Sequence, residues 1–322
     1  MDVSTVSRSL NGSYGIHKET REKVLAIAAE LNYRPNRVAR GLATGRSHTV
    51  GLVVSDIRNP FFAEIARGAE DAAFAAGCDL VLCNSDLDAE KQMHYIQSLL
   101  DKRVDGLVMN SVGSLDRSQQ EFLAGSGVPV VLLNRPRSDS NFSTVTADNP
   151  EGGFRAASHL MQFGHLRIAH LTGPRDDGNL RERSRGFLRA LAGHAGASPI
   201  VVHGDHTFAG GFAMMSALLR NDPAVTAVFA GNDVIAFGAV RAILEAGLRV
   251  PDDISIVGFD DIELASVIHP PLTTVRQPKY ETGKAAIEIL LAGADRNRPS
   301  LPEHRVLDIE LIERQSCAPP RH

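Results

Sequence analysis

Residues 49–77 read TVGLVVSDIRNPFFAEIARGAEDAAFAAG and contain one complete strand–helix unit. The uninterrupted apolar run Thr49–Val54 predicts a strand that is buried on both faces. The next run predicts a helix over Pro60–Ala76, with proline at an early helical position and Gly77 as its stop. A strand of this kind, followed directly by a covering helix, is typical of a parallel α/β sheet.

The same alternation continues along the chain and restarts near the middle. Strands are predicted at Asp79–Cys83, Gly106–Asn110, Val128–Asn134, Thr144–Ala147, Ile168–Thr172, Ile200–His203, Ala227–Ala230 and Ile254–Phe259. Further helices are predicted at Ala89–Lys102, Ser118–Ala124, Pro150–Phe163, Arg181–Ala192, Ala209–Arg220 and Asp233–Ala246. We therefore predict an α/β fold with two doubly wound parallel-sheet subdomains. The late helix Lys279–Leu291 and the strand Val306–Ile312 could return to either half.

Polar side chains directly follow several predicted strands. Parallel sheets bind ligands at the carboxyl ends of their strands, and two facing halves would place a small-molecule site between them. Helix N-capping is the alternative explanation for the Asp and Asn residues among them. The candidates are Asp56, Asn59, Phe61, Asp148, Asn232, Asp233, Asp260 and Asp261.

Charge is distributed unevenly along the chain. The 322 residues carry a formal net charge of −4. Residues 1–48 hold eight Lys and Arg against four Asp and Glu, or +4, which leaves 26 basic and 34 acidic residues, or −8, for the remainder. A basic head on an acidic body is expected when one end contacts nucleic-acid phosphates. A solvated basic helix would give the same count.

Several classes of protein are disfavoured by what the sequence lacks. It has no run of 18 apolar residues and no secretory signal, so we expect a cytoplasmic protein without a membrane partner. The three cysteines lack metal-ligand spacing, and no H-E-x-x-H pair occurs. Dinucleotide, phosphate-loop and G-x-S-x-G signatures are also absent, so we predict no enzyme, no catalytic residues, no cofactor and no metal.

The first residues differ in character from the rest. Val3–Leu10 predicts a short helix rich in Ser, Thr and Arg, and a loop follows at Asn11–Ile16. An amphipathic helix is predicted from Lys18 to Leu31, with Val24, Leu25, Ala28 and Leu31 on its apolar face. Small hydroxyl side chains with an arginine suit base edges and phosphates, although an ordinary helical hairpin would show the same pattern.

A series of collinear motifs resembles the lactose-repressor (LacI/GalR) family of transcriptional regulators. The motifs are VSTVSRSLNG at 3–12, TREKV at 20–24, LNYRPNRVAR at 31–40, IRNPFF at 57–62, FGH at 163–165, GP at 173–174, RSRGF at 183–187, ND at 232–233, VGFDD at 257–261 and LTTVRQP at 272–278. They span nearly the whole chain. The resemblance implies a DNA-binding regulator, expected to be a repressor, whose operator affinity is controlled by a small-molecule effector, expected to be a sugar.

The resemblance places a DNA-binding head and hinge at the start of the chain. It implies a partial helix-turn-helix domain at 1–34 and a hinge at 35–45. Two subdomains follow, each made of two segments: one of residues 46–146 and 278–305, the other of residues 147–277 and 306–322. Leu42 matches the position that inserts into the minor groove at the operator centre. The implied DNA-binding residues are Val3, Ser4, Thr5, Ser7, Arg8, Asn11, Asn36, Arg37, Ala39 and Leu42.

The resemblance also places an effector site between the subdomains. Phe61 and Phe62 match apolar positions at its lip, and His206 matches a position where relatives carry a stacking aromatic. The polar residues implied to grip the effector are Asp148, Arg183, Asn232, Asp260 and Gln277. A homodimer on a pseudo-palindromic operator is expected. Whether the effector induces or corepresses is left open.

One feature departs from the family pattern. The first helix of the helix-turn-helix, which normally precedes the Val-Ser at 3–4, is missing. We expect the natural protein to begin upstream; if Met1 is the true start, we expect weak operator binding. An exported solute-binding protein and a sugar-metabolising enzyme are the two rival interpretations. Salt-dependent binding to a palindromic duplex separates the regulator from both.

Overall fold

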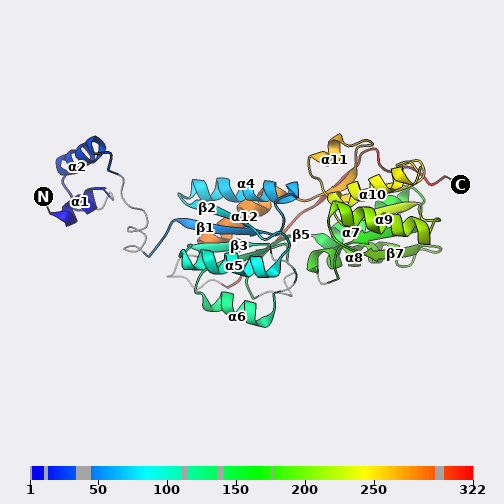
Figure 1. Ribbon diagram of the computed structural model, residues 1–322, viewed down its shortest axis with the longest axis horizontal. Coiled ribbons are helices and arrows are strands. Elements are labelled where there is room, and N and C mark those ends of the chain that lie inside the picture. The colour runs from blue at the N-terminus through cyan, green and yellow to red at the C-terminus, as the bar shows by residue number, and fades with distance from the viewer. Residues whose placement is uncertain are drawn as a thin grey trace. The chain divides into compact units, whose positions relative to one another are not determined.

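The computed structural model describes residues 2–10, 14–33, 45–110, 113, 115–135, 141–175, 177–293 and 301–321. The chain divides into two compact units, Met1–His48 and Thr49–His322. The first unit contains the helices α1 (Val3–Leu10) and α2 (Lys18–Glu30), which pack against each other (Figure 1).

The second unit, which we call the body, contains two six-stranded sheets. The first sheet has the order β11-β5-β4-β3-β1-β2, and all its strands are parallel. Its strands are β1 (Thr49–Val54), β2 (Asp79–Asn84), β3 (Gly106–Met109), β4 (Val130–Leu133), β5 (Ser143–Ala147) and β11 (His304–Leu307). Its helices are α4 (Pro60–Ala75), α5 (Ala89–Asp101), α6 (Arg117–Gly125) and α12 (Lys279–Gly293).

The second sheet has the order β12-β10-β9-β8-β6-β7, with only β12 antiparallel to its neighbour. Its strands are β6 (Arg167–Thr172), β7 (Ser198–His203), β8 (Ala227–Ala230), β9 (Ser255–Asp260), β10 (Thr273–Arg276) and β12 (Glu310–Ile312). Its helices are α7 (Asn149–Gln162), α8 (Gly178–Leu191), α9 (Phe208–Asn221), α10 (Asp233–Glu245) and α11 (Leu264–Val267). The predicted α/β class with two doubly wound parallel subdomains is confirmed.

Alternation along the strands explains why each sheet is covered on both faces. Val50, Leu52 and Val54 of β1 lie in a hydrophobic cluster with α4 and α12, whereas Val53 lies in a separate cluster with α5 and α6. The second sheet is divided in the same way between α9 with α10 and α7 with α8. Because both faces of each strand are buried, the strands appear in the sequence as continuous apolar runs.

Helix boundaries follow from local chemistry. The Asn59 side chain accepts a hydrogen bond from the Phe61 backbone N–H, with Pro60 at the first helical position of α4. Gly77, which the sequence predicts as the stop of this helix, has a positive φ of 73°.

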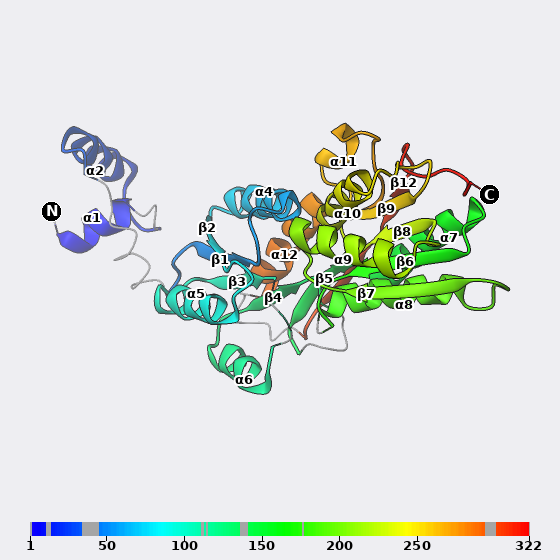
Figure 2. The same cartoon turned by 45° about the vertical axis from the view of Figure 1, so that its right-hand side comes forward.

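The chain crosses between the two halves of the body three times. The crossings join β5 to α7, β10 to α12 and β11 to β12, and α12 lies among the elements of the first half (Figures 1 and 2). Each crossing leaves from the carboxyl end of a strand. Since parallel strands end at the same edge of a sheet, both sheets direct their carboxyl ends toward the boundary between the halves.

The last predicted strand is divided in the structure. Val306–Ile312 was expected to form one strand, but β11 ends at Leu307 in the first sheet and β12 begins at Glu310 in the second. Between them Ile309 is buried in the cluster beneath α7 and α8. The chain changes sheets here because one continuous strand could not pair with both. The predicted domain boundaries stay a prediction.

Candidate functional site

Arg183 lies at the centre of a buried polar cluster in the second half. It projects from α8 and is only 6% exposed. Its Nε donates to the Asn149 Oδ1 at 2.8 Å and its Nη1 donates to the Gly231 carbonyl at 2.5 Å. The guanidinium lies 3.6 Å from the centre of the Phe259 ring. Burial lowers the pKa of this guanidinium, and nearby Asp260 opposes the shift.

Asp260 stands beside Arg183 at the carboxyl end of β9. The side chain of Gln277 donates to its Oδ1 at 2.6 Å, and Arg183 Nη1 lies 3.7 Å from the same oxygen. Burial raises the pKa of the Asp260 carboxyl, and the Arg183 guanidinium opposes this. Within the described part of the chain, Arg183 Nη2 and Asp260 Oδ2 make no hydrogen bond. The cluster therefore retains a fixed donor and a fixed acceptor for a ligand.

Asn232 and His206 extend this cluster. Asn232 follows Gly231, and the Gly231 carbonyl accepts a hydrogen bond from Arg183. Its Oδ1 caps α10 by accepting from the Ile235 N–H at 2.7 Å, and its Nδ2 donates to the His206 carbonyl at 3.2 Å. The His206 Nδ1 is buried without a hydrogen-bond partner among the described residues. Asn232 thus fixes the segment that carries His206.

Three predicted effector residues have structural roles at or near the boundary between the halves. Asp148 caps α7, since its Oδ1 accepts from the Glu151 N–H at 3.0 Å. Phe61 and Phe62 are buried in the hydrophobic cluster of the first half, with their rings edge-to-face at 5.1 Å. Ile262 of the second half belongs to the same cluster. Contact of these three side chains with an effector stays a prediction.

The sequence did not predict two features of the site, namely the contact of Asn149 with Arg183 and a group formed by Ser55, Asn110 and Asn134. Asn149 holds Arg183, and its own Nδ2 donates to the Ala147 carbonyl at 3.1 Å. In the first half, Asn110 Nδ2 donates to Ser55 Oγ at 3.0 Å, and Asn134 Nδ2 donates to Asn110 Oδ1 at 3.3 Å. Ser55, Asn110 and Asn134 directly follow β1, β3 and β4, respectively. Their position after a strand was the available signal, but Asn110 and Asn134 were assigned to the strands themselves.

Asp233 is a second buried carboxylate near Asp260. It accepts hydrogen bonds from the Thr274 hydroxyl at 2.6 Å and from the Ile262 N–H at 2.9 Å. Burial, with repulsion from Asp260, raises its pKa well above the ordinary value. Asp233 ties the loop after β9 to the start of α10.

The candidate DNA-binding surface lies on α1 of the first unit. Ser4, Ser7 and Arg8 are exposed and Thr5 is half-buried, whereas Ser9 is buried and donates to the Thr5 carbonyl. Nothing is described of the Val3 side chain, and Asn11, Asn36, Arg37, Ala39 and Leu42 lie outside the described residues. Exposure at spacings of three and four residues places Ser4, Ser7 and Arg8 on one face of the helix.

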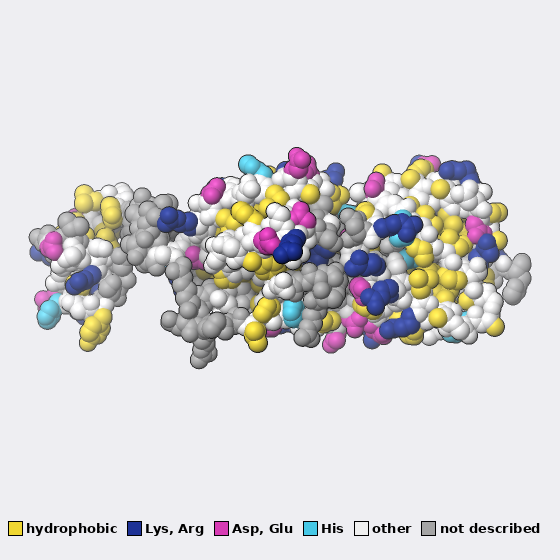
Figure 3. Space-filling view, turned by 90° about the horizontal axis from the view of Figure 1, so that it is seen from below, with side chains coloured by type: hydrophobic (Ala, Val, Ile, Leu, Met, Phe, Trp, Pro, Cys, Tyr) yellow, Lys and Arg dark blue, Asp and Glu magenta, His cyan; other side chains and the backbone are white. Residues whose placement is uncertain are grey.

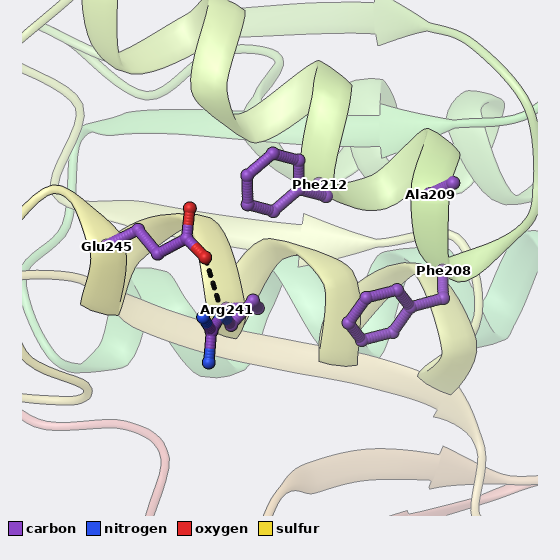
Figure 4. A pocket seen from close by; sticks show the side chains of 5 residues that line it. All are labelled: Phe208, Ala209, Phe212, Arg241 and Glu245. Carbon is purple, nitrogen blue, oxygen red and sulfur yellow. Dashed lines mark hydrogen bonds and ion pairs between the residues drawn. The ribbon is translucent and has the colours of Figure 1, made fainter.

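A pocket of about 520 Å³ opens between α9 and α10, and none of its lining residues belongs to the polar cluster. Figure 4 shows the Phe208 and Phe212 rings of α9 beside the ion pair of Arg241 and Glu245 from α10. Elsewhere on the body, one face mixes Lys and Arg with Asp and Glu (Figure 3). In the described ranges we find no cluster of side chains suited to a metal ion and no helix suited to crossing a membrane.

Comparison with known proteins gives consistent results for both units. Residues 2–36 match the family model of bacterial regulatory proteins of the lacI family, and residues 47–305 match that of periplasmic binding proteins and the sugar binding domain of the LacI family. The chain is 38% identical to catabolite control protein A of Priestia megaterium over 90% of its length and 88% of that protein. It is 37% identical to the ribose operon repressor of Escherichia coli K12 over 98% of its length and 96% of that protein.

A solved structure of a lac repressor dimer bound to operator and the anti-inducer ONPF is similar over 98% of this chain and 95% of that chain. The TM-score is 0.87 and the sequence identity is 31%. The similarity therefore covers the head and both halves of the body.

Proposed function

Because this chain belongs to the LacI family of bacterial regulatory proteins, we propose that it is a sequence-specific transcriptional repressor whose operator affinity is set by a bound sugar. The family consists of transcriptional regulators, so the chain is a regulator and not an enzyme. The observation that carries the effector part of the proposal is the buried Arg183–Asp260 pair with its unused donor and acceptor.

The effector lies between the two halves in this proposal. Both sheets direct their strand ends to the boundary, where the second half offers Arg183, Asp260 and Gln277 and the first half offers Asn110 and Asn134. Amide groups and an Arg–Asp pair donate to and accept from hydroxyl groups. Phe61, Phe62, Asp148, His206 and Asn232 complete the proposed effector site.

The charge of the cluster favours a neutral sugar over a phosphorylated one. The Arg183 guanidinium lies beside one buried carboxyl group, that of Asp260, and the buried carboxyl group of Asp233 accepts hydrogen bonds from Thr274 and Ile262. A phosphate placed there would lie beside the Asp260 carboxylate, which repels it, while the nearby Lys279 ammonium is already held by the Asp260 and Asp261 carbonyls. We propose D-ribose as the first probe, since a relative 37% identical to this chain is named as the ribose operon repressor.

The head binds operator DNA through α1. Ser4, Thr5, Ser7 and Arg8, with Val3, are proposed to face the major groove. Asn11, Asn36, Arg37, Ala39 and Leu42 are proposed to add backbone and minor-groove contacts. The proposed domain organisation is a head at 1–34, a hinge at 35–45, and subdomains at 46–146 with 278–305 and at 147–277 with 306–322. An operator partner places the protein in the cytoplasm.

A homodimer is the proposed assembly. Each half of the body leaves large apolar side chains exposed, with Phe74 and Leu82 in the first half and Leu244 and Val267 in the second. The pocket beside Phe208 adds to this apolar surface. Exposed apolar side chains that gather in one patch mark sites of protein association. A second copy is the proposed occupant, because a structurally similar lac repressor is described as a dimer on its operator.

Calorimetric titration with D-ribose tests the effector site. The wild-type protein is expected to bind, and Arg183→Lys is expected to weaken binding by about tenfold or more, because lysine cannot hold Asn149 and Gly231 while presenting a second donor. Arg185→Lys is the matched control, since Arg185 is exposed on the same helix and pairs with Glu182.

Two results would contradict this assignment. If neither D-ribose nor any other neutral sugar in a panel binds the wild-type protein, the proposed effector class is wrong. If Arg183→Lys binds D-ribose as tightly as Arg185→Lys does, the ligand lies elsewhere. Circular dichroism of both variants confirms that each is folded before titration.

A further inference from the structure

The loop that ends β9 has an unusual backbone. Asp260 and Asp261 are consecutive non-glycine residues with positive φ values of 110° and 52°. Such conformations are costly and persist only where the surrounding structure holds them. The backbone at this point also sets the direction of the Asp260 carboxylate, which faces Arg183 and Gln277.

Two arginine side chains of the second half hold the Asp261 carboxylate of this loop. The Asp261 carboxylate accepts from Arg276 Nε at 2.7 Å and from Arg314 Nη2 at 2.6 Å. Burial acts to raise the pKa of Asp261, but the hydrogen bonds from these two arginines outweigh it and lower that pKa. Both arginines come from the second sheet or the segment that follows it.

A side chain of the first half holds the backbone of the same loop. Lys279 Nζ donates to the Asp260 carbonyl at 2.8 Å and to the Asp261 carbonyl at 2.7 Å. Lys279 is the first residue of α12, which packs against α4 and contacts β3, β4 and β5. Lys279 therefore begins a helix of the first half, whereas the two carbonyls belong to the second.

We propose that Lys279 is a positioning residue that couples the relative orientation of the two halves to the direction of the Asp260 carboxylate. It does not contact the effector in this scheme. A rotation of the first half displaces the Lys279 ammonium from the two carbonyls and frees a strained loop, so Asp260 loses its alignment with Arg183. Because linkage is reciprocal, an effector held by Asp260 favours the orientation that Lys279 stabilises. This inference rests on the proposed effector site.

Three variants separate this role from a general contribution to folding. Lys279→Met keeps the length of the side chain but removes its donors, and Lys279→Arg keeps the charge and the donors. Lys284→Met changes an exposed lysine on the same helix and is the matched control. Urea unfolding of the ligand-free proteins is expected to show one cooperative transition for every variant, with Lys279→Met less stable than Lys284→Met by about 1.4 kcal/mol, the equivalent of a tenfold change in equilibrium.

Hydrogen exchange provides a readout that needs no ligand. The Ile262 N–H of this loop donates to the Asp233 carboxylate at the start of α10. Its exchange is expected to accelerate by about tenfold in Lys279→Met, to return toward the wild-type rate in Lys279→Arg and to stay unchanged in Lys284→Met. An unchanged rate in Lys279→Met would overturn the proposal, whatever the protein binds.

Titration with D-ribose tests the coupling to the site. Lys279→Met is expected to raise the D-ribose Kd by about tenfold, with recovery in Lys279→Arg. Faster exchange with an unchanged Kd would also overturn the proposal, because the loop would then be held without orienting Asp260. If Lys279→Met shows faster exchange but the wild-type protein binds no sugar, the proposed effector class is refuted. The operator affinities of the same variants then test the coupling. Equal operator affinity of Lys279→Met and Lys284→Met would overturn it.

Discussion

At the scale of single residues, the contacts of Arg183 predict that no other cation can replace it. Its guanidinium is held edge-on by Asn149 and Gly231 and supported on one face by Phe259. The planar guanidinium makes all three contacts and still presents one N–H donor. A lysine ammonium cannot make the same three contacts and present a further donor. The resemblance to a known family pointed to Arg183, Asp260 and Gln277, and the structure brings these three together.

The supporting residues could not be predicted in the same way. Asn149 and Phe259 act on Arg183 from a helix and a strand that are far apart in sequence. Their role depends on which strands are neighbours in the sheet, and an apolar run alone does not determine strand order. Helix capping by Asp148 and Asn232 was foreseen as the alternative explanation, and both side chains do form caps.

The buried imidazole of His170 predicts a dependence of stability on pH. The ring stacks on Phe229 at 4.4 Å, and burial lowers its pKa to about 3 from the ordinary 6.5, while a hydrogen bond between Nδ1 and the Phe229 carbonyl opposes this shift. Between these two pH values the unfolded chain binds one proton more than the folded chain. The free energy of unfolding should therefore fall as pH drops through this window, by up to about 1.4 kcal/mol per pH unit.

Urea unfolding of His170→Phe between about pH 4 and pH 6 measures this contribution. The variant should lose the part of the slope that His170 supplies, whereas His194→Gln, which changes an exposed histidine, should follow the wild-type curve. Curves for His170→Phe and wild type that run parallel across the window would show that His170 does not carry the effect.

At the scale of elements, close helix pairing is a repeated device of the body. The pairs α4 with α12, α7 with α8 and α9 with α10 each place glycines where the helix backbones meet. A Cβ on Gly186 would lie 1.9 Å from the Pro150 carbonyl oxygen, and one on Gly153 would lie 2.0 Å from that of Arg183. These glycines therefore set how close α8, which carries Arg183, lies to α7, which carries Asn149.

Gly186→Ala is expected to force α7 and α8 apart and to lower the free energy of unfolding by about 3 kcal/mol. Gly125→Ala is the control, because a Cβ there meets nothing within 4 Å, and alanine should be neutral or stabilise α6 by up to about 1 kcal/mol. Thermal or urea unfolding compares the two. Equal stabilities would contradict the role given to the glycine contact.

Sequence periodicity was sufficient for most elements but not for the last ones. Strands such as β1 and β9 are continuous apolar runs, so their burial on both faces was predictable. The placement of α12, β11 and β12 was not, because each depends on where the chain crosses between the halves. Val306–Ile312 looked like one strand because residues 308–309 contain neither glycine nor proline, and Asp308 alone is a weak turn signal.

At the scale of the whole molecule, three crossings and one lysine link the halves of the body. The crossings leave the strands at the boundary where the proposed effector binds, and Lys279 bridges the same boundary. A ligand that contacts both halves can therefore bias their relative orientation. In the proposed homodimer such a change would reach two hinges and two heads, and this is the proposed route from ligand binding to operator affinity.

The proposed function requires that this chain recognise an inverted-repeat operator under the control of a sugar. Selection from a pool of random duplexes, followed by titration of the selected site with and without D-ribose at several salt concentrations, tests it directly. We expect enrichment of one inverted repeat, an affinity at least about a thousandfold above that for random duplex and falling with salt, and a shift of that affinity by the sugar. The absence of any preference for an inverted repeat over random duplex, with D-ribose and without it, would contradict the account.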